Sequence, residues 1–132
     1  MKQVLGKLCH DTLNDDRRGV CMAVARSHTG HYRVMLEIDN NEVWFDEERI
    51  SSDIDYADSD QDTEFPTYAR DMLGKTVREN LTNYAGVATC LVQYFPSNEI
   101  YVTVEKVGIE GDILSNSFPL SRVTPPNYQE VK

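Results

Sequence analysis

The sequence of 132 residues contains no apolar run approaching the roughly 18 to 20 residues that are needed to span a bilayer. Its first residues, MKQVLGKLCHD, lack the hydrophobic region of a signal peptide. Cysteine is scarce, and Cys9, Cys21 and Cys90 form no CxxC pair and no spacing typical of a metal site. An odd number of cysteines without a secretory signal fits buried thiols in a reducing compartment. We therefore expect a cytoplasmic protein with no membrane partner.

Catalytic signatures are missing as well. The sequence has no GxSxG, HExxH, P-loop or dinucleotide-binding motif. The three histidines, His10, His28 and His31, have no neighbouring cysteines or carboxylates that complete a set of metal ligands. These absences predict a protein that is not an enzyme and that uses no cofactor and no metal.

Positive charge is in short supply: 13 lysines and arginines face 22 acidic residues, which gives a net charge of -9. The segment 51–72 holds 1 basic and 7 acidic residues and so contributes -6 of that total. Proteins that bind nucleic acid need lysine and arginine to displace counterions from phosphates. The charge therefore argues against direct nucleic-acid binding and permits a partner with a basic surface.

What the sequence does contain is an internal repeat of about 50 residues. LGKLCHDTLNDDRRGV, which begins at Leu5, aligns with LGKTVRENLTNYAGV, which begins at Leu73. Further along, YRVMLE aligns with IYVTVE and FDEERI with FPLSRV. The alignment matches Asp11 with Glu79 and Arg49 with Arg122 in the two copies; Gly19 likewise matches Gly86.

Each copy has the pattern of short antiparallel strands. HYRVMLEI and EIYVTVEKV alternate between apolar and polar residues, and Asx- and Gly-rich turns separate the runs. Gly19 and Gly86 are expected at a turn exit or bulge where a Cβ atom would be obstructed. Leu73 and Val87 are expected to face the core. Four or five short strands per copy predict an all-β protein of two tandem small β-barrels, residues 1–50 and 73–132, joined by an acidic linker, residues 51–72.

The motifs of the two copies together resemble a group of small phage and prophage proteins. The second copy supplies the opening pattern LGxxV…LTxYxGV, from Leu73 to Val87, and the first copy supplies the closing pattern WFDEERI, from Trp44 to Ile50. The resemblance covers about 95 residues and implies SH3-like or Tudor-like barrels and a phage protein acting in the cytoplasm of a bacterial host. It implies no catalytic residues.

The linker reads SSDIDYADSDQDTEFPTYARDM and is dense in acids. It fits a solvated connector, because like charges repel and little apolar surface is available. Alternatives are a Ca²⁺ loop, an imitation of spaced phosphates, and a segment that packs through Ile54, Tyr56, Phe65 and Tyr68. A short helical turn can begin at Pro66. The acids assigned to partner binding are Asp53, Asp55, Asp58, Asp60, Asp62 and Glu64.

A second set of candidate partner-binding residues lies near the end of the first copy. Aromatic side chains beside acids suit an arginine- or lysine-rich target, and alternation places Trp44 and Phe45 on opposite faces of a strand. The set consists of Tyr32, Trp44, Phe45, Asp46, Glu47 and Glu48.

The resulting hypothesis is an accessory protein that binds and inhibits a host protein, either a nucleic-acid-acting or a defence enzyme. The alternatives are a sponge for a small nucleotide signal, with a pocket between the barrels, and a virion or connector component. The oligomeric state stays open.

Overall fold

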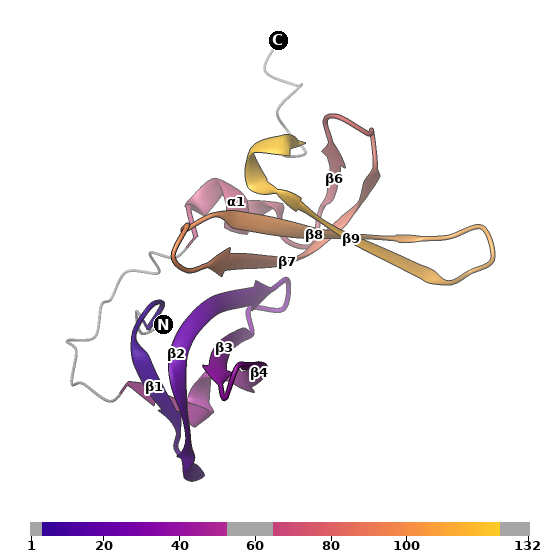
Figure 1. The fold of residues 1–132 in the computed structure, drawn as a ribbon. Coiled ribbons are helices and arrows are strands. Elements are labelled where there is room, and N and C mark those ends of the chain that lie inside the picture. Colours follow the sequence, from indigo (N-terminus) through magenta and orange to yellow (C-terminus); the bar gives the residue numbers. More distant parts are fainter. Residues whose placement is uncertain (1–3, 53–64, 125–132) are drawn as a thin grey trace.

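The computed structural model describes residues 4–52 and 65–124, which form a curled antiparallel sheet with one short α-helix (Figure 1). We call these two ranges the first half and the second half. The first half contains β1 (Leu8–Asp11), β2 (Asn14–Ser27), β3 (Tyr32–Ile38), β4 (Asn41–Asp46), the 3-10 helix η1 (Glu47–Arg49) and β5 (Ile50–Ser52). The second half contains α1 (Thr67–Met72), β6 (Thr76–Glu79), β7 (Ala85–Tyr94), β8 (Ile100–Val107), β9 (Ile113–Pro119), the 3-10 helix η2 (Leu120–Arg122) and β10 (Val123–Thr124). The predicted all-β class is confirmed, with α1 as the exception within these residues.

The two halves have strands that pair in the same order. In the first half β1 lies between β2 and β5, while β3 joins β2 to β4. In the second half β6 lies between β7 and β10, while β8 joins β7 to β9. In both halves a 3-10 helix precedes the last strand. The last strand of each half therefore returns to the first, and this return curls the sheet.

The halves meet where β2 pairs with β7. The N-terminal part of β2 pairs with β1 and its C-terminal part with β7, and β7 divides its partners in the same way between β6 and β2. Ala25 lies opposite Val92 at the centre of this junction. Ala25 and Val92 are separated by the same number of residues as the matched glycines Gly19 and Gly86. The central pair of the junction therefore joins two equivalent positions of the repeat. The halves are thus related by an approximate two-fold axis through the junction.

Most buried apolar side chains of residues 4–52 and 65–124 belong to one connected cluster that includes members of both halves. Cys9 and Cys21 are buried in it, as expected, whereas Cys90 is half-buried. Leu73 packs partly buried against the cluster. Val87 is 38% exposed and the expectation that it faces the core is wrong. Its neighbour Ala88 is buried instead, because successive side chains of a strand point to opposite faces.

Two matched glycines allow a close approach of neighbouring strands. A Cβ atom on Gly19 would lie 2.0 Å from the carbonyl oxygen of Glu37, and one on Gly86 would lie 2.3 Å from that of Glu105. Both distances are far shorter than a van der Waals contact. The expected obstruction of a Cβ atom at these positions is confirmed.

Parts of the predicted linker belong to the folded sheet and its core. Residues 51 and 52 are the end of β5, and Phe65 is only 1% exposed in the core. The helix α1 follows directly after Pro66 and buries Ala69 and Met72, while Tyr68 on its other side is 54% exposed. The predicted acidic residues of the linker, with Ile54 and Tyr56, lie outside the described residues: Asp53, Asp55, Asp58, Asp60, Asp62 and Glu64.

Candidate functional site

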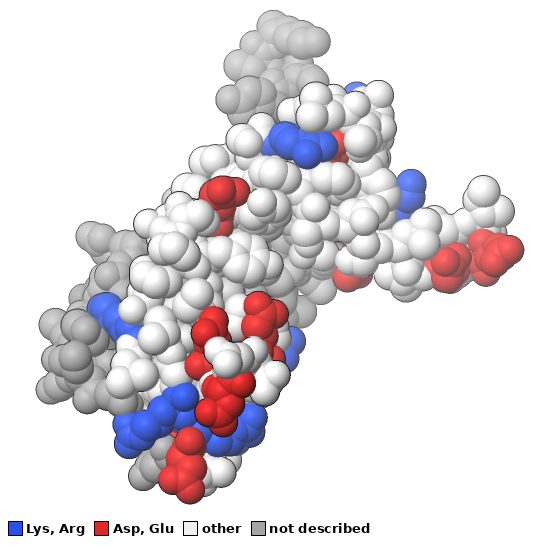
Figure 2. Space-filling view, viewed as in Figure 1, with Lys and Arg blue, Asp and Glu red and all other residues white. Residues whose placement is uncertain are grey.

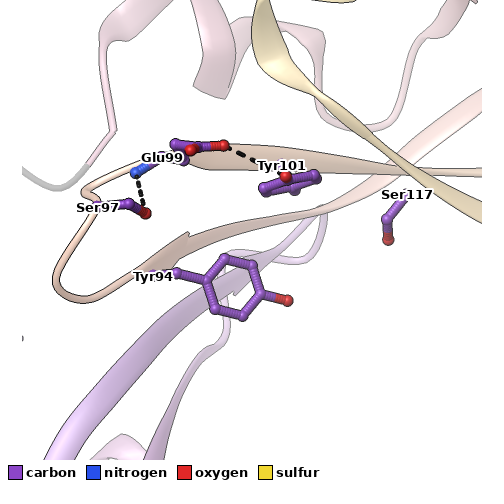
Figure 3. Close-up of a pocket in the computed structure, with 5 residues that line it drawn as sticks. All are labelled: Tyr94, Ser97, Glu99, Tyr101 and Ser117. Carbon is purple, nitrogen blue, oxygen red and sulfur yellow. Dashed lines mark hydrogen bonds between the residues drawn. The ribbon is translucent and has the colours of Figure 1, made fainter.

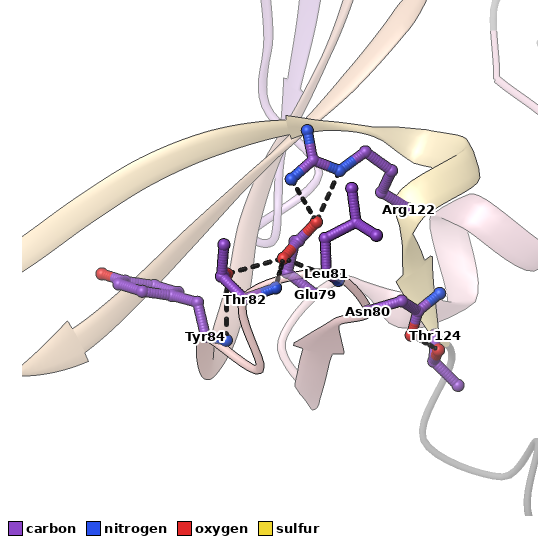
Figure 4. Close-up of polar contacts among 7 residues, drawn as sticks. All are labelled: Glu79, Asn80, Leu81, Thr82, Tyr84, Arg122 and Thr124. Atoms are coloured by element: carbon purple, nitrogen blue, oxygen red, sulfur yellow. Dashed lines mark hydrogen bonds and ion pairs between the residues drawn. The ribbon is translucent and has the colours of Figure 1, made fainter.

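Each half contains a buried carboxylate that pairs with an arginine of its 3-10 helix. In the first half Asp11 is fully buried, accepts a hydrogen bond of 3.0 Å from the Leu13 amide, and lies 2.5 Å from Nη2 of Arg49. In the second half Glu79 is fully buried and lies 2.5 Å from Nη2 of Arg122 (Figure 4). The pairs join the first strand of each half to the helix that precedes its last strand.

The hydrogen bonds around Glu79 keep its carboxyl group ionised. Its Oε1 accepts hydrogen bonds of 2.6 Å from both the amide and the hydroxyl of Thr82, and one of 3.1 Å from the amide of Leu81 (Figure 4). Burial would raise the pKa of Glu79, but these bonds and the one from Arg122 outweigh it and lower the pKa to about 2. The Leu13 amide and then Arg49 lower the pKa of Asp11 in the same way. Every oxygen is occupied within the fold, so we assign both pairs a structural role.

The three aromatic residues predicted to bind a partner already contact arginines of the chain itself. Phe45 is buried in the core, with the guanidinium of Arg17 4.8 Å and that of Arg49 5.5 Å from its ring centroid. Half-buried Trp44 has the guanidinium of Arg33 at 5.6 Å. Half-buried Tyr32 has the guanidinium of Arg26 at 5.5 Å. Phe45 and Trp44 do point to opposite faces of the strand. An arginine of the same chain, however, already lies over each ring.

The predicted acidic residues of the same segment are distributed along its surface. The carboxylate of Asp46 lies 2.9 Å from Nε2 of His31, and this hydrogen bond is the main cause that lowers the pKa of Asp46. Glu48 is exposed and Glu47 is half-buried. Acidic and basic side chains intermingle over the first half in Figure 2 rather than forming a surface of one sign.

A pocket that the sequence did not reveal lies at the hairpin between β7 and β8. It has a volume of about 410 Å³ and is lined by Tyr94, Ser97, Glu99, Tyr101 and Ser117 (Figure 3). The two tyrosine rings meet edge to face, with centroids 5.6 Å apart and planes at 83°. The hydroxyl of Tyr101 donates a hydrogen bond of 3.2 Å to Oε2 of Glu99. Two aromatic rings and a carboxylate thus converge on one open space.

The register of the strands explains why these residues meet. Tyr94 ends β7 and Tyr101 is the second residue of β8, so the turn at 95–99 brings them to the same end of the hairpin. Ser117 on β9 lies opposite Thr103, two residues after Tyr101, on the same face of the sheet. The available sequence signal was an aromatic residue on each side of the turn FPSNE. That signal indicates only a turn, because a sequence does not show which faces two strands share.

The electrostatics of the pocket favour a cation. Burial raises the pKa of the Tyr94 phenol, and the negative charge of Glu42 on β4 raises it further. Tyr94 therefore remains a neutral hydrogen-bond donor at neutral pH. Within residues 4–52 and 65–124, no lysine or arginine lies over either tyrosine ring. Rings next to a carboxylate attract ammonium and guanidinium groups, since the π face and the carboxylate are both negative.

No group of three or more histidine, cysteine or acidic side chains in the described segments is placed to hold a metal ion. None of the helices in those segments has the length and hydrophobicity required to cross a membrane. Comparison with protein-family models, curated proteins and solved structures found no match for the chain.

Proposed function

We propose that this chain is a non-enzymatic binding protein whose Tyr94–Tyr101–Glu99 pocket takes a lysine or arginine side chain of a basic protein partner. The observation that carries the proposal is the convergence of two rings and a carboxylate in a pocket of about 410 Å³. The net charge of -9 supports it, because it attracts basic partners over a distance and repels anionic ones.

The pocket also bears on the alternative of a nucleotide sponge. Its volume lies within the range of small-molecule sites, roughly 300 to 1,000 Å³. Its carboxylate and the nearby Glu42 repel phosphate groups, however, and no basic side chain is among the five residues that line it. We therefore favour a basic protein segment over a phosphorylated ligand.

The wider role that we propose is that of a phage accessory protein which binds and inhibits a host protein with a basic surface. The resemblance of the two copies to small phage proteins supports the setting. We further propose that each half is one SH3-like barrel. The pairing of the first strand with both the second and the last strand in each half supports this interpretation.

A peptide titration tests the pocket. The probe is a fluorescent peptide of about eight residues containing arginine and lysine, with a control peptide in which citrulline and acetyl-lysine replace the charged residues. We expect the charged peptide alone to bind, and Glu99→Gln to weaken binding about tenfold, as expected for loss of one charge-assisted hydrogen bond.

Glu48→Gln is the matched control, because it removes the same charge from an exposed residue far along the chain. Equal losses of affinity in Glu99→Gln and Glu48→Gln would mean that only the net charge matters. Failure of the charged peptide to bind at low salt would refute the pocket assignment. The host partner is sought by pulldown from a bacterial lysate, and a complex that high salt leaves intact would argue against a charge-driven interface.

A further inference from the structure

The order of pairing leaves four strands of the described sheet with one neighbour each: β4, β5, β9 and β10. Of these, β5 and β10 are only 3 and 2 residues long. Reading across the junction, the strands run β4-β3-β2-β7-β8-β9, with β4 and β9 at the two edges. The free side of an edge strand presents unpaired N–H and C=O groups and is a template for pairing with another strand. Proteins commonly protect such edges with charged side chains.

The two edges differ in how they are protected. The edge strand β4 carries Glu42 and Asp46, both exposed. Its counterpart β9, which reads ILSNSFP, carries no charge over seven residues, and its first five side chains are exposed. Ile113 is 64% and Leu114 is 40% exposed, and the β8–β9 hairpin that holds them projects from the body of the molecule (Figure 1). Within the described residues, β9 is thus an edge of about 23 Å that carries no charge, exposes apolar side chains at its start and pairs with no strand on its outer side.

The sequence of β9 is complementary to itself when it is read in opposite directions. Around Asn116, an antiparallel pair of two copies sets Ser115 against Ser117, Leu114 against Phe118, and Ile113 against Pro119. Each apolar residue then meets an apolar one and each serine meets a serine on the same face of the sheet. Cross-strand pairs of this kind stabilise a sheet, while like charges opposite each other would destabilise it.

We propose that β9 is a homodimer interface, in which two copies of this chain pair their β9 strands antiparallel about Asn116. The two sheets then become one continuous sheet. The two-fold axis is perpendicular to it, so both pockets containing Ser117 open on the same face. One strand pair with its flanking apolar residues is a small interface, for which we expect a dissociation constant of roughly 1 to 100 µM.

Sedimentation velocity tests the interface, with the 15.1 kDa full chain from about 5 to 500 µM to span the expected constant. We expect the wild type to shift towards twice that mass as the concentration rises. Asn116→Lys sets two lysines against each other at the centre of the pair, and we expect it to raise the dissociation constant at least about tenfold. Asn41→Lys is the matched control, because it makes the same change at an exposed position of the other edge strand. We expect it to leave dimerisation unchanged.

A second variant keeps the proposal testable if Asn116→Lys disturbs the hairpin. Opposite Cβ atoms of an antiparallel pair lie about 4.5 to 5.5 Å apart, close to the separation that a disulfide bridges. We therefore expect Asn116→Cys to form a covalent dimer on mild oxidation, and Asn41→Cys to form none above the wild-type background. A wild type that stays monomeric at all concentrations would overturn the proposal, and so would a dimer that neither Asn116 variant affects.

Discussion

Truncation of Phe65 tests whether the end of the predicted linker is part of the core. The ring is 1% exposed and packs in the same cluster as Ala69 and Met72 of α1. Removal of a buried phenylalanine ring costs about 3 to 5 kcal/mol, from lost transfer free energy and the cavity left behind. A domain of this size has about 5 to 15 kcal/mol of stability in total. We therefore expect Phe65→Ala to remove about a fifth or more of the free energy of unfolding and to lower Tm by roughly 10 to 20 °C.

The assay is thermal and urea unfolding, followed by circular dichroism and by the fluorescence of Trp44, the only tryptophan of the sequence. Trp44 lies in the first half, whereas Phe65 lies in the second. The fluorescence of Trp44 therefore reports whether the loss of stability caused by Phe65→Ala also affects the first half. We expect the two transitions to coincide, because most buried apolar residues belong to one cluster. Tyr68→Ala is the control, since Tyr68 lies on the same helix but is 54% exposed, and we expect a change within about 0.5 kcal/mol. A Phe65→Ala protein as stable as Tyr68→Ala would refute the reasoning.

Two further predictions concern the strands of the second half. Gly86→Ala places a Cβ atom 2.3 Å from the carbonyl oxygen of Glu105, so we expect chemical denaturation to show a loss of about 2 to 3 kcal/mol. Gly111→Ala, with φ of +86° but nothing within 4 Å, is expected to lose about 1 kcal/mol, and equal losses would exclude the steric explanation. Because its pKa is lowered to about 2, ionised Glu79 stabilises the fold fully above pH 4.5, and we expect this contribution to disappear as the pH falls from 4.5 to 2. The difference in urea midpoint between wild type and Glu79→Gln should shrink over that range, and a constant difference would contradict the assignment.

Much of the strand pattern could be predicted from the sequence, because alternation and turn residues are local signals. The match of Asp11 with Glu79 and of Arg49 with Arg122 anticipated two positions of the repeat. The alignment of the two copies could not show that each carboxylate forms an ion pair with the arginine of its own half. The two partners are far apart in sequence, and a contact between distant residues leaves no local pattern. The sequence predicts the wrong face for Val87 for a related reason: a shift of one residue in register exchanges the two faces of a strand.

The candidate site was harder to predict, because aromatic residues beside acids look alike in a sequence whether they are covered or free. Trp44 and Phe45 are partly or fully buried and contact arginines, whereas Tyr94 and Tyr101 form the open pocket. What distinguishes the two groups is which arginine side chains reach the rings. That depends on neighbours across the sheet such as Arg33, and the chain reveals these neighbours only when it is folded.

The pairing of β2 with β7 has a consequence for how the two halves can differ. A protein with one copy alone would leave the C-terminal part of its long second strand unpaired. A separate molecule would then have to pair with that part, and the extent of this pairing would depend on the protein concentration. Linking the copies makes this pairing intramolecular, at an effective concentration on the order of millimolar. Two identical molecules must also carry identical edges, whereas the linked halves need not. This freedom permits one outer edge, β4, to remain charged while the other, β9, is left without charge.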